Sequence, residues 1–380
     1  MQTKINIVPS KKIVNLPTYI FAELDVWKED ARNKGVDIID LGIGNPDGPT
    51  PLPIVEAAIE SIKKPESHGY PSFRGKKELR EAIVAWMKSR YNVDIDPETE
   101  VQTLIGAKEG IAHIAFAYTD PGDINIVPDP YYPVFSRGTW VSSGDVYHIP
   151  LKEENDFLPD LKSIPDDIAE KAKIFLVNFP NNPTAAVATK EFYTELVEFC
   201  TKNNILLVTD LAYGEICYDG FRPLSIFEIP GAKDVAIEFH SFSKTFNMAG
   251  WRIGFAVGNK DIIANLYKMK TNIDYGTSSI VQDAAICALS IDYSYIQKTV
   301  DKYQRRRDFM IEGFKKLGWD HKVTKATMYL WFKVPADNDS KSWCKKVFDK
   351  TGVVFTPGIA FGNYSDNSIL NHLNNEFNQF

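Results

Sequence analysis

The chain has 380 residues, of which 44% are hydrophobic and 24% charged, and its formal net charge is −7 at pH 7. This length favours two domains, and the composition is typical of a soluble globular protein. The acidic balance argues against nucleic acid as a partner, because no basic stripe is left to neutralise phosphates.

Cysteines and histidines exclude further classes of protein. The four cysteines form no Cys-x-x-Cys pair, which is typical of reduced thiols in a cytoplasmic protein. The six histidines lack metal-ligand spacing, so we expect no metal. The first residues lead into no apolar stretch and no run reaches membrane-spanning length, so neither a signal peptide nor a membrane partner is expected.

The N-terminal part predicts a helix and then a glycine-rich loop. Apolar residues over 16–31 have the spacing of an amphipathic helix. A short strand over 38–41 then leads into a loop with Gly42 and Gly44, where the backbone could approach a ligand closely. A plain turn explains this loop equally well. A dinucleotide fingerprint is excluded because no Gly-x-Gly-x-x-Gly opens a helix here.

Two helices are predicted on either side of an irregular loop. Thr50 is expected to cap a helix that begins in Thr-Pro-Leu-Pro. The loop at 68–75 precedes a strong helical pattern that begins at Lys77. Tyr70 lies in this loop, where a tyrosine is commonly a packing residue.

From 100 to 260, short apolar runs alternate with amphipathic helical segments, and each run ends in a polar cluster. This alternation predicts an α/β fold, with a mostly parallel sheet sandwiched by helices. Ligands of such sheets bind beyond the carboxyl ends of the strands. The residues expected to converge there are Ala107, Lys108, Tyr132, Asn182, Asp210, Tyr213 and Lys244.

Three of these clusters suggest specific chemistry. Asp210 ends a wholly apolar run, so its carboxylate needs a cation or hydrogen bonds; a protonated pyridine nitrogen would suit, and a helix cap is the alternative. Asn182 precedes a proline, which is also typical of a bare turn. The segment 106–108 opens a helix whose free N–H groups suit a phosphate, although ordinary helix initiation explains it as well.

The segment 241–254 lies between two apolar runs and carries an amine, Lys244, and a guanidinium, Arg252. Ser241 and Ser243 lie beside the amine. A lysine that forms an imine with an aldehyde cofactor needs such a frame, with a cation to hold an anionic group. The alternative is two solvated surface charges.

Beyond 260 the pattern predicts helices at 260–272, 280–290, 295–317 and 340–350, and strands at 328–334 and 353–356. These segments are typical of a separate α+β unit. We predict a large cofactor-binding domain over 46–280 and a small domain formed by 1–45 and 281–380.

The segment 241–254 resembles the cofactor-lysine segment of the class I/II pyridoxal-phosphate aminotransferases of the aspartate-aminotransferase fold type. It is most similar to the branch with alanine, aspartate and LL-diaminopimelate aminotransferases, and the resemblance extends over the chain apart from residues 363–380. It implies transfer of an amino group between an amino acid and a 2-oxo acid through a Lys244 Schiff base, with Lys244 moving the proton as general base and acid. Glutamate is the expected donor.

The resemblance also implies roles for the other residues. Asp210 would pair with the cofactor ring nitrogen, Asn182 and Tyr213 would meet the ring hydroxyl, and Tyr132 would stack on the ring. The residues expected around the phosphate are Ala107, Lys108, Ser241, Ser243 and Arg252.

The remaining roles concern the substrate and a second subunit. Tyr70 would reach the phosphate of the neighbouring subunit, which implies a homodimer. Gly44 would lie against the substrate. Tyr19 and Tyr275 are weaker candidates for the substrate side, since core packing explains each as well.

The sequence departs from the family in three places. Ala185 stands where the family usually has glycine, and Tyr275-Gly-Thr stands where plant-type diaminopimelate enzymes have Asn-Gly, which argues against that substrate. Residues 356–362 match the family's Pro-Gly-x-x-Phe-Gly, but 363–380 contain no lysine or arginine, where the family has an arginine for the substrate carboxylate.

Three explanations account for this ending: a changed reading frame near 363, which is preferred, a different cation, or a protein that binds the cofactor and turns over poorly. The competing functions are a carbon–sulfur lyase or decarboxylase on the same scaffold, and a pyridoxal-phosphate-binding protein of low activity.

Overall fold

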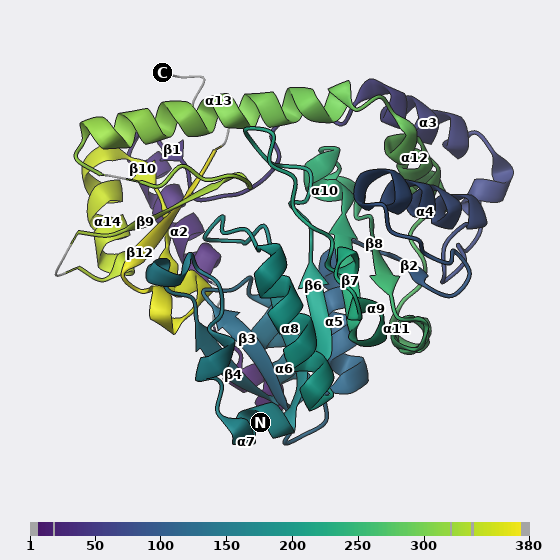
Figure 1. Ribbon diagram of the computed structural model, residues 1–380. Helices are drawn as coiled ribbons and strands as arrows, with labels where there is room; N and C mark the ends of the chain where they lie inside the picture. Colours follow the sequence, from purple (N-terminus) through teal and green to yellow (C-terminus); the bar gives the residue numbers. More distant parts are fainter. Residues whose placement is uncertain (1–6, 18–19, 320, 336–337, 374–380) are drawn as a thin grey trace, which may run out of the picture.

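A seven-stranded sheet forms the centre of the computed structural model, which describes residues 7–17, 20–319, 321–335 and 338–373 (Figure 1). The strand order is β2-β8-β7-β6-β5-β3-β4. The neighbours from β4 to β7 pair in parallel, and β8 runs antiparallel to β7 and β2. The strands are β2 (Val101–Leu104), β3 (Ile124–Asp129), β4 (Asp145–Pro150), β5 (Ala172–Asn178), β6 (Leu206–Asp210), β7 (Ala236–Ser241) and β8 (Gly254–Gly258).

Helices cover both faces of this sheet, because alternate residues of its buried strands point to opposite sides. On β5, Phe175 and Val177 pack in the apolar cluster of α8 (Lys190–Asn203). Ile174 packs in the cluster of α5 (Ala107–Tyr118) and α11 (Lys260–Ile273) on the other face. The predicted sandwich is therefore confirmed. The other helices beside the sheet are α6 (Val134–Val141), α7 (Asp166–Lys171) and α9 (Ala232–Val235).

A second group of elements combines both ends of the chain. Strand β1 (Ile39–Asp40) pairs in parallel with β10 (Val353–Val354). Strand β12 (Ser368–His372) lies between β9 (Tyr329–Lys333) and β11 (Thr356–Pro357), antiparallel to both. The helices of this group are α2 (Ile20–Asn33) and α14 (Ser340–Thr351). Helix α1 (Lys11–Asn15) instead contacts α6 beside the large sheet, where the Lys12 amine donates to the Val141 carbonyl at 2.9 Å.

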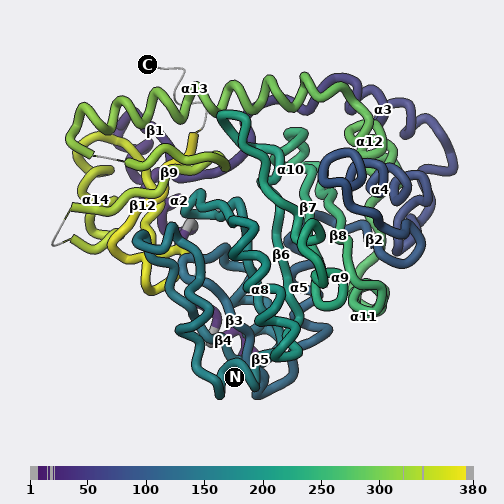
Figure 2. Tube along the Cα trace, in the orientation of Figure 1, coloured from purple at the N-terminus to yellow at the C-terminus, as the bar shows by residue number. Residues whose placement is uncertain are grey.

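The long helix α13 (Ser294–Lys316) runs along one edge of the molecule and spans both groups (Figure 2). At one end lie α3 (Leu52–Ile62), α4 (Lys77–Tyr91) and α12 (Ser279–Ser290), with α12 packed against the other two. The domain boundaries at 45 and 280 stay a prediction. No helix in the described part of the chain combines the length and apolarity needed to span a bilayer.

The predicted role of Thr50 is wrong. Helix α3 begins at Leu52 after Pro51, and the Thr50 side chain does not cap it. Its hydroxyl donates to the Asn247 carbonyl at 2.8 Å and accepts from the Trp251 indole at 3.0 Å. Thr50 instead ties the N-terminal segment to the segment that carries Lys244.

Ala185 has φ +60°, in the left-handed region that glycine adopts without strain. Its N–H donates to the Asn181 carbonyl at 3.0 Å, so the turn after Asn182 closes without glycine. The substitution costs backbone strain but preserves the turn.

Strand β12 carries a polar residue, Asn371, in an environment that does not satisfy its hydrogen-bonding groups. Its side chain is fully buried, and neither its amide nitrogen nor its oxygen has a hydrogen-bond partner. Burying an amide without partners costs about 1–3 kcal/mol.

We therefore expect Asn371→Val to stabilise the protein by about 1–2 kcal/mol, because a β-branched apolar side chain suits a buried strand. Urea unfolding of the variant and the native protein measures the difference. Asn33→Val, at the exposed end of α2, is the control and should change stability by less than about 0.5 kcal/mol. Destabilisation by Asn371→Val would contradict this account of β12.

Candidate active site

The carboxyl ends of β5 and β6 are joined by one asparagine. Asn178 donates from its amide nitrogen to the Asp210 carbonyl at 2.7 Å. Its amide oxygen accepts from the Asn182 backbone N–H at 2.7 Å. Asn178 therefore fixes the turn that carries Asn182 next to the strand that ends in Asp210. The sequence analysis missed this residue, although its place at a strand end is a signal.

Asp210 is buried, and its carboxylate accepts the Ala212 N–H at 3.0 Å. It caps a turn, and no helix follows it directly. Burial raises the pKa of Asp210 to about 6, and the hydrogen bond from the Ala212 N–H acts against this rise. A cation placed against this carboxylate would remove much of the desolvation penalty.

Asn182 and Tyr213 lie on the loops after these strands. Asn182 is 9% exposed, and its amide oxygen is buried with no hydrogen-bond partner. The Tyr213 hydroxyl shares a short hydrogen bond with the Tyr329 hydroxyl, and burial raises the pKa of Tyr213. An unpartnered buried oxygen at a strand end indicates a site built for a ligand.

Lys244 lies in the one-turn helix α10 (Phe242–Thr245), which follows β7 and begins after Ser241. The Ser241 hydroxyl accepts the Ser243 N–H at 3.2 Å and so caps this turn. The Lys244 amine donates to the Gly44 carbonyl at 3.0 Å. Burial, and next the charge of Arg252, lower the pKa of Lys244 to about 8. A fraction of the amine is thus a free nucleophile near neutral pH.

Three further cations gather at the start of α5. Gly106 has φ +85°, and a Cβ there would lie 2.6 Å from Nη2 of Arg252, so the guanidinium covers the glycine. Burial, then Arg137 and Arg252, lower the pKa of Lys108. Mutual repulsion of this kind marks a place that an anion would stabilise. The sequence analysis missed Arg137, which is in α6 only five positions after Tyr132.

The cation cluster lies at the N-terminus of α5, which begins at Ala107. Free N–H groups and the helix dipole add to its preference for an anion. Tyr132 lies beside it, with the Lys108 amine 5.8 Å from the ring centre. The electrostatic influence of Tyr132 on Tyr213 and Tyr329 places it on the same side as these hydroxyls.

Tyr70 and Tyr275 lie at the surface. Tyr70 is 85% exposed, and its ring stacks on Tyr275 at 4.7 Å. Tyr275 stacks in turn on Phe73 at 4.6 Å. Gly44 contacts the Lys244 amine of its own chain, whereas Tyr70 packs on Tyr275. Tyr19 lies outside the described residues.

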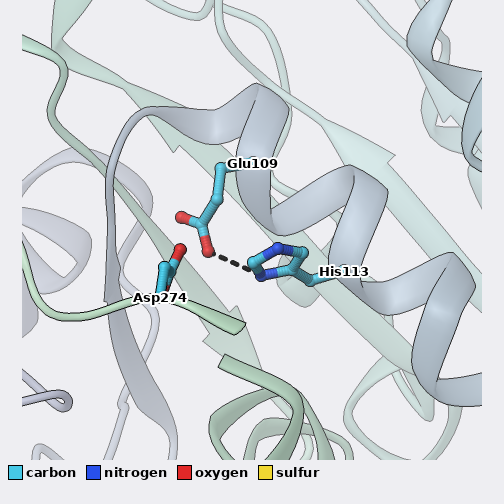
Figure 3. Close-up of side chains that lie close together, drawn as sticks. All are labelled: Glu109, His113 and Asp274. Atoms are coloured by element: carbon cyan, nitrogen blue, oxygen red, sulfur yellow. Dashed lines mark ion pairs between the residues drawn. The ribbon is translucent and has the colours of Figure 1, made fainter. Parts of the chain in front are cut away.

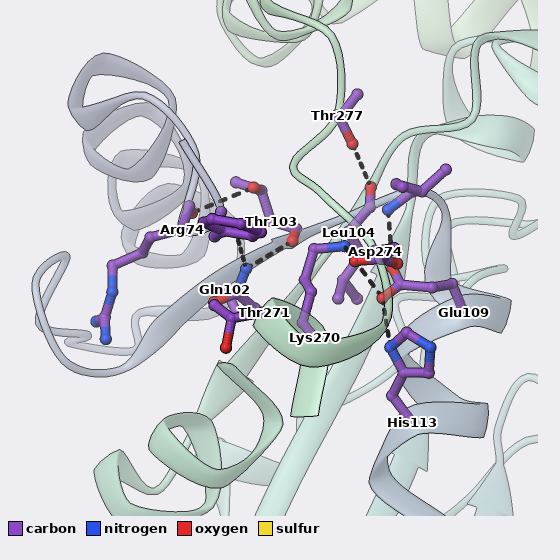
Figure 4. Close-up of polar contacts among 12 residues, drawn as sticks. Arg74, Gln102, Thr103, Leu104, Glu109, His113, Lys270, Thr271, Asp274 and Thr277 are labelled. Carbon is purple, nitrogen blue, oxygen red and sulfur yellow. Dashed lines mark hydrogen bonds and ion pairs between the residues drawn. The ribbon is translucent and has the colours of Figure 1, made fainter. Parts of the chain in front are cut away.

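The described residues include one group with metal-ligand spacing, namely Glu109, His113 and Asp274 (Figure 3). The Lys270 amine already binds this group, at 3.2 Å from Glu109 and 2.8 Å from Asp274 (Figure 4). A buried ammonium supplies the positive charge that a metal would otherwise provide. Glu109 also accepts the Ile105 N–H at 2.9 Å, so this network fixes the turn before Gly106.

The end of the chain brings a histidine into the site. His372 is buried on β12, and its ring meets that of Tyr329 at 4.8 Å. Leu370, two positions earlier on the same face, is buried and apolar. Residues 363–373, the described part of this ending, present no lysine or arginine.

Comparisons with known proteins agree with this geometry. Residues 36–369 match the family model of the class I and II aminotransferases. The LL-diaminopimelate aminotransferase of Aquifex aeolicus is 51% identical over 94% of this chain and 92% of its own, and that of Halothermothrix orenii is 49% identical over 93% and 91%. A probable N-succinyldiaminopimelate aminotransferase of Thermus thermophilus, 33% identical, superposes with a TM-score of 0.90 over 94% of this chain and 96% of its own.

These relatives are aminotransferases, so the lyase, decarboxylase and low-activity alternatives gain no support from them. The family match covers most of the described chain, and the solved relative has the same fold. The chain belongs to the class I and II aminotransferase family and is an enzyme that transfers amino groups.

Proposed function

We propose that this chain is an LL-diaminopimelate aminotransferase that carries pyridoxal 5′-phosphate on Lys244. The relatives that share about half of its sequence are named for this substrate. This similarity outweighs the argument from Tyr275-Gly-Thr against diaminopimelate. The second amino acid of the exchange is glutamate, with 2-oxoglutarate as its 2-oxo acid, as the resemblance implies.

The residues present fit this cofactor. The observation that carries the proposal is the buried Lys244 amine, whose pKa of about 8 leaves it reactive between a cation cluster and a buried carboxylate. The unpartnered oxygen of Asn182 fits a ring hydroxyl that donates a hydrogen bond. Lys108, Arg252 and the first turn of α5 fit a phosphate.

Each residue then has a definite task. When bound, the cofactor supplies an electron sink for the pair of electrons left at the substrate Cα. Asp210 holds the proton on the ring nitrogen by its negative charge. Lys244 would take the Cα proton on Nζ and deliver it to the cofactor carbon, as an amino-group transfer requires, and Tyr132 would cover one face of the ring.

Two tasks concern the surroundings. Gly44 would lie against the substrate, and its lack of a side chain lets the rings of His372 and Tyr329 approach the backbone there. Tyr70 serves the site of a second copy in a homodimer, which fits its exposure. A cytoplasmic location is part of the same proposal.

The lowered pKa of Lys244 predicts how cofactor attachment depends on pH. Below pH 8 the amine is protonated, so the rate should fall about tenfold per pH unit and level off above pH 8. Stopped-flow absorbance with cofactor-free protein measures this rate. Lys260→Ala, at the exposed start of α11, should leave the profile unchanged. A rate of attachment that keeps rising up to a midpoint near pH 10 would contradict the lowered pKa of Lys244.

The raised pKa of Asp210 predicts weaker cofactor binding in acid. Above pH 6 the carboxylate is charged and pairs with the ring cation; below pH 6 it is protonated and the pairing is lost. Asp210→Asn should remove this pH dependence and lower kcat by about 100-fold or more. Fluorescence titration with the cofactor measures the pH dependence of binding, and steady-state rates measure kcat. The exposed Asp234→Asn should behave as the native protein does.

The dimer role of Tyr70 predicts complementation. Lys244→Ala and Tyr70→Ala proteins should each be nearly inactive. Unfolded together in equal amounts and refolded, they should regain about a quarter of native activity, because half of the dimers are mixed and each has one intact site. No gain on mixing would show that Tyr70 serves its own subunit.

A further inference from the structure

Strand β12 brings one titratable side chain into the site, and no role has been assigned to it. His372 ends this strand, and its backbone N–H donates to the Leu41 carbonyl at 2.9 Å. This bond joins β12 to the segment that leads to Gly42 and Gly44. The C-terminal strand is thereby fixed against the N-terminal loop beside the lysine.

The ring of His372 lies over Gly44. A Cβ on Gly44 would meet His372 Cε1 at 2.3 Å and Nδ1 at 2.5 Å. The carbonyl of the same glycine accepts the Lys244 amine at 3.0 Å. The imidazole and the reactive amine therefore flank one residue, with the Tyr329 ring on the third side.

His372 Nδ1 is buried and has no hydrogen-bond partner, in a side chain that is 4% exposed. Burial, followed by the charge of Lys244, lowers the pKa of His372 to about 3, so the free imidazole is neutral. The ring is also hydrogen-bonded to the Gly42 backbone, whose carbonyl accepts the Thr356 hydroxyl at 2.6 Å as well. A proton can therefore lie on Nδ1 without leaving that carbonyl unpaired.

An arginine near β12 is the alternative candidate for binding a substrate carboxylate. Arg306 lies close, since its Nη1 donates to the Leu373 carbonyl at 3.1 Å. However, the same nitrogen lies 2.5 Å from the Asp47 carboxylate, which also binds Lys302 at 2.5 Å. Arg306 is thus engaged with the Asp47 carboxylate, whereas His372 borders Gly44, whose carbonyl accepts the Lys244 amine.

We propose that His372 binds the substrate carboxylate next to Lys244, through a hydrogen bond from Nδ1. The inference rests on the proposed function, since it assigns a contact of that same site. A carboxylate placed between Lys244 and His372 would favour the neutral imidazole form that carries its proton on the unpaired Nδ1, because that form donates a hydrogen bond to the carboxylate. A single imidazole bond is weaker than a two-pronged arginine contact, so substrates bind more weakly here than an arginine would permit.

The test uses protein loaded with pyridoxal phosphate and succinate as probe, because succinate has carboxylates but no amino group to transfer. Calorimetry should show succinate binding at least about tenfold weaker in His372→Leu than in the native protein, as expected for a lost hydrogen bond to a charged group. His372→Gln retains a donor and should stay within about threefold of the native protein. Asn371→Val, which faces the opposite side of β12, should bind as the native protein does.

A spectroscopic readout separates binding from a structural role. In protein labelled with ¹⁵N-histidine, the Nδ1 signal of His372 should move toward the protonated range when succinate is added. Equal succinate affinity in native and His372→Leu protein, an unmoved signal, or no binding to native protein overturns the inference. The proposed function fails separately, if the cofactor is not found on Lys244.

Discussion

The burial of one amine among cations is the constraint on which this structure depends. Lys244 is held by β7 in a turn capped by Ser241, close enough to Arg252 for that charge to lower its pKa. Desolvation and like charge both make the ammonium form costly. The fold accepts this cost because the same cations suit a phosphate and the free amine is what the transfer reaction needs.

The order of the strands in the sheet brings these charged and polar residues together. Parallel strands β5, β6 and β7 end side by side, so Asn178, Asp210 and Ser241 lie at one edge. Antiparallel β8 returns directly from the lysine turn, which places Arg252 over Gly106. Behind this turn, Lys270 pairs with Glu109 and Asp274 and holds the start of α5. The site is thus fixed by buried contacts on three sides.

Sequence reasoning predicted much of this arrangement, since it rests on local signals. Apolar runs with polar ends located the strands, and Asp210, Asn182 and Lys244 each stand where such a run stops. Residues that act through long-range contacts were missed. His372 comes to the site only through the pairing of β12 with β9, which no local pattern predicts. Asn178 at the end of β5 and Arg137, five positions after Tyr132, did carry a local signal that was not used. Thr50 failed as a cap because its hydroxyl binds Asn247 and Trp251, some 200 positions away.

The ending of the chain also shows that sequence reasoning does not predict long-range contacts. Composition alone identified 363–380 as atypical, and the buried, unpartnered amide of Asn371 gives that judgement a physical basis. Yet the pattern could not reveal that the neighbouring His372 would border Gly44, because this requires the pairing of β12 with β9.

The central claim is a covalent link between pyridoxal phosphate and one amine. Borohydride reduction of the loaded protein, followed by peptide mass spectrometry, tests it directly. The account predicts the mass of the reduced cofactor on the peptide with Lys244 and on no other lysine at equal stoichiometry. An unmodified Lys244 peptide, or the cofactor on Lys108 instead, would contradict it.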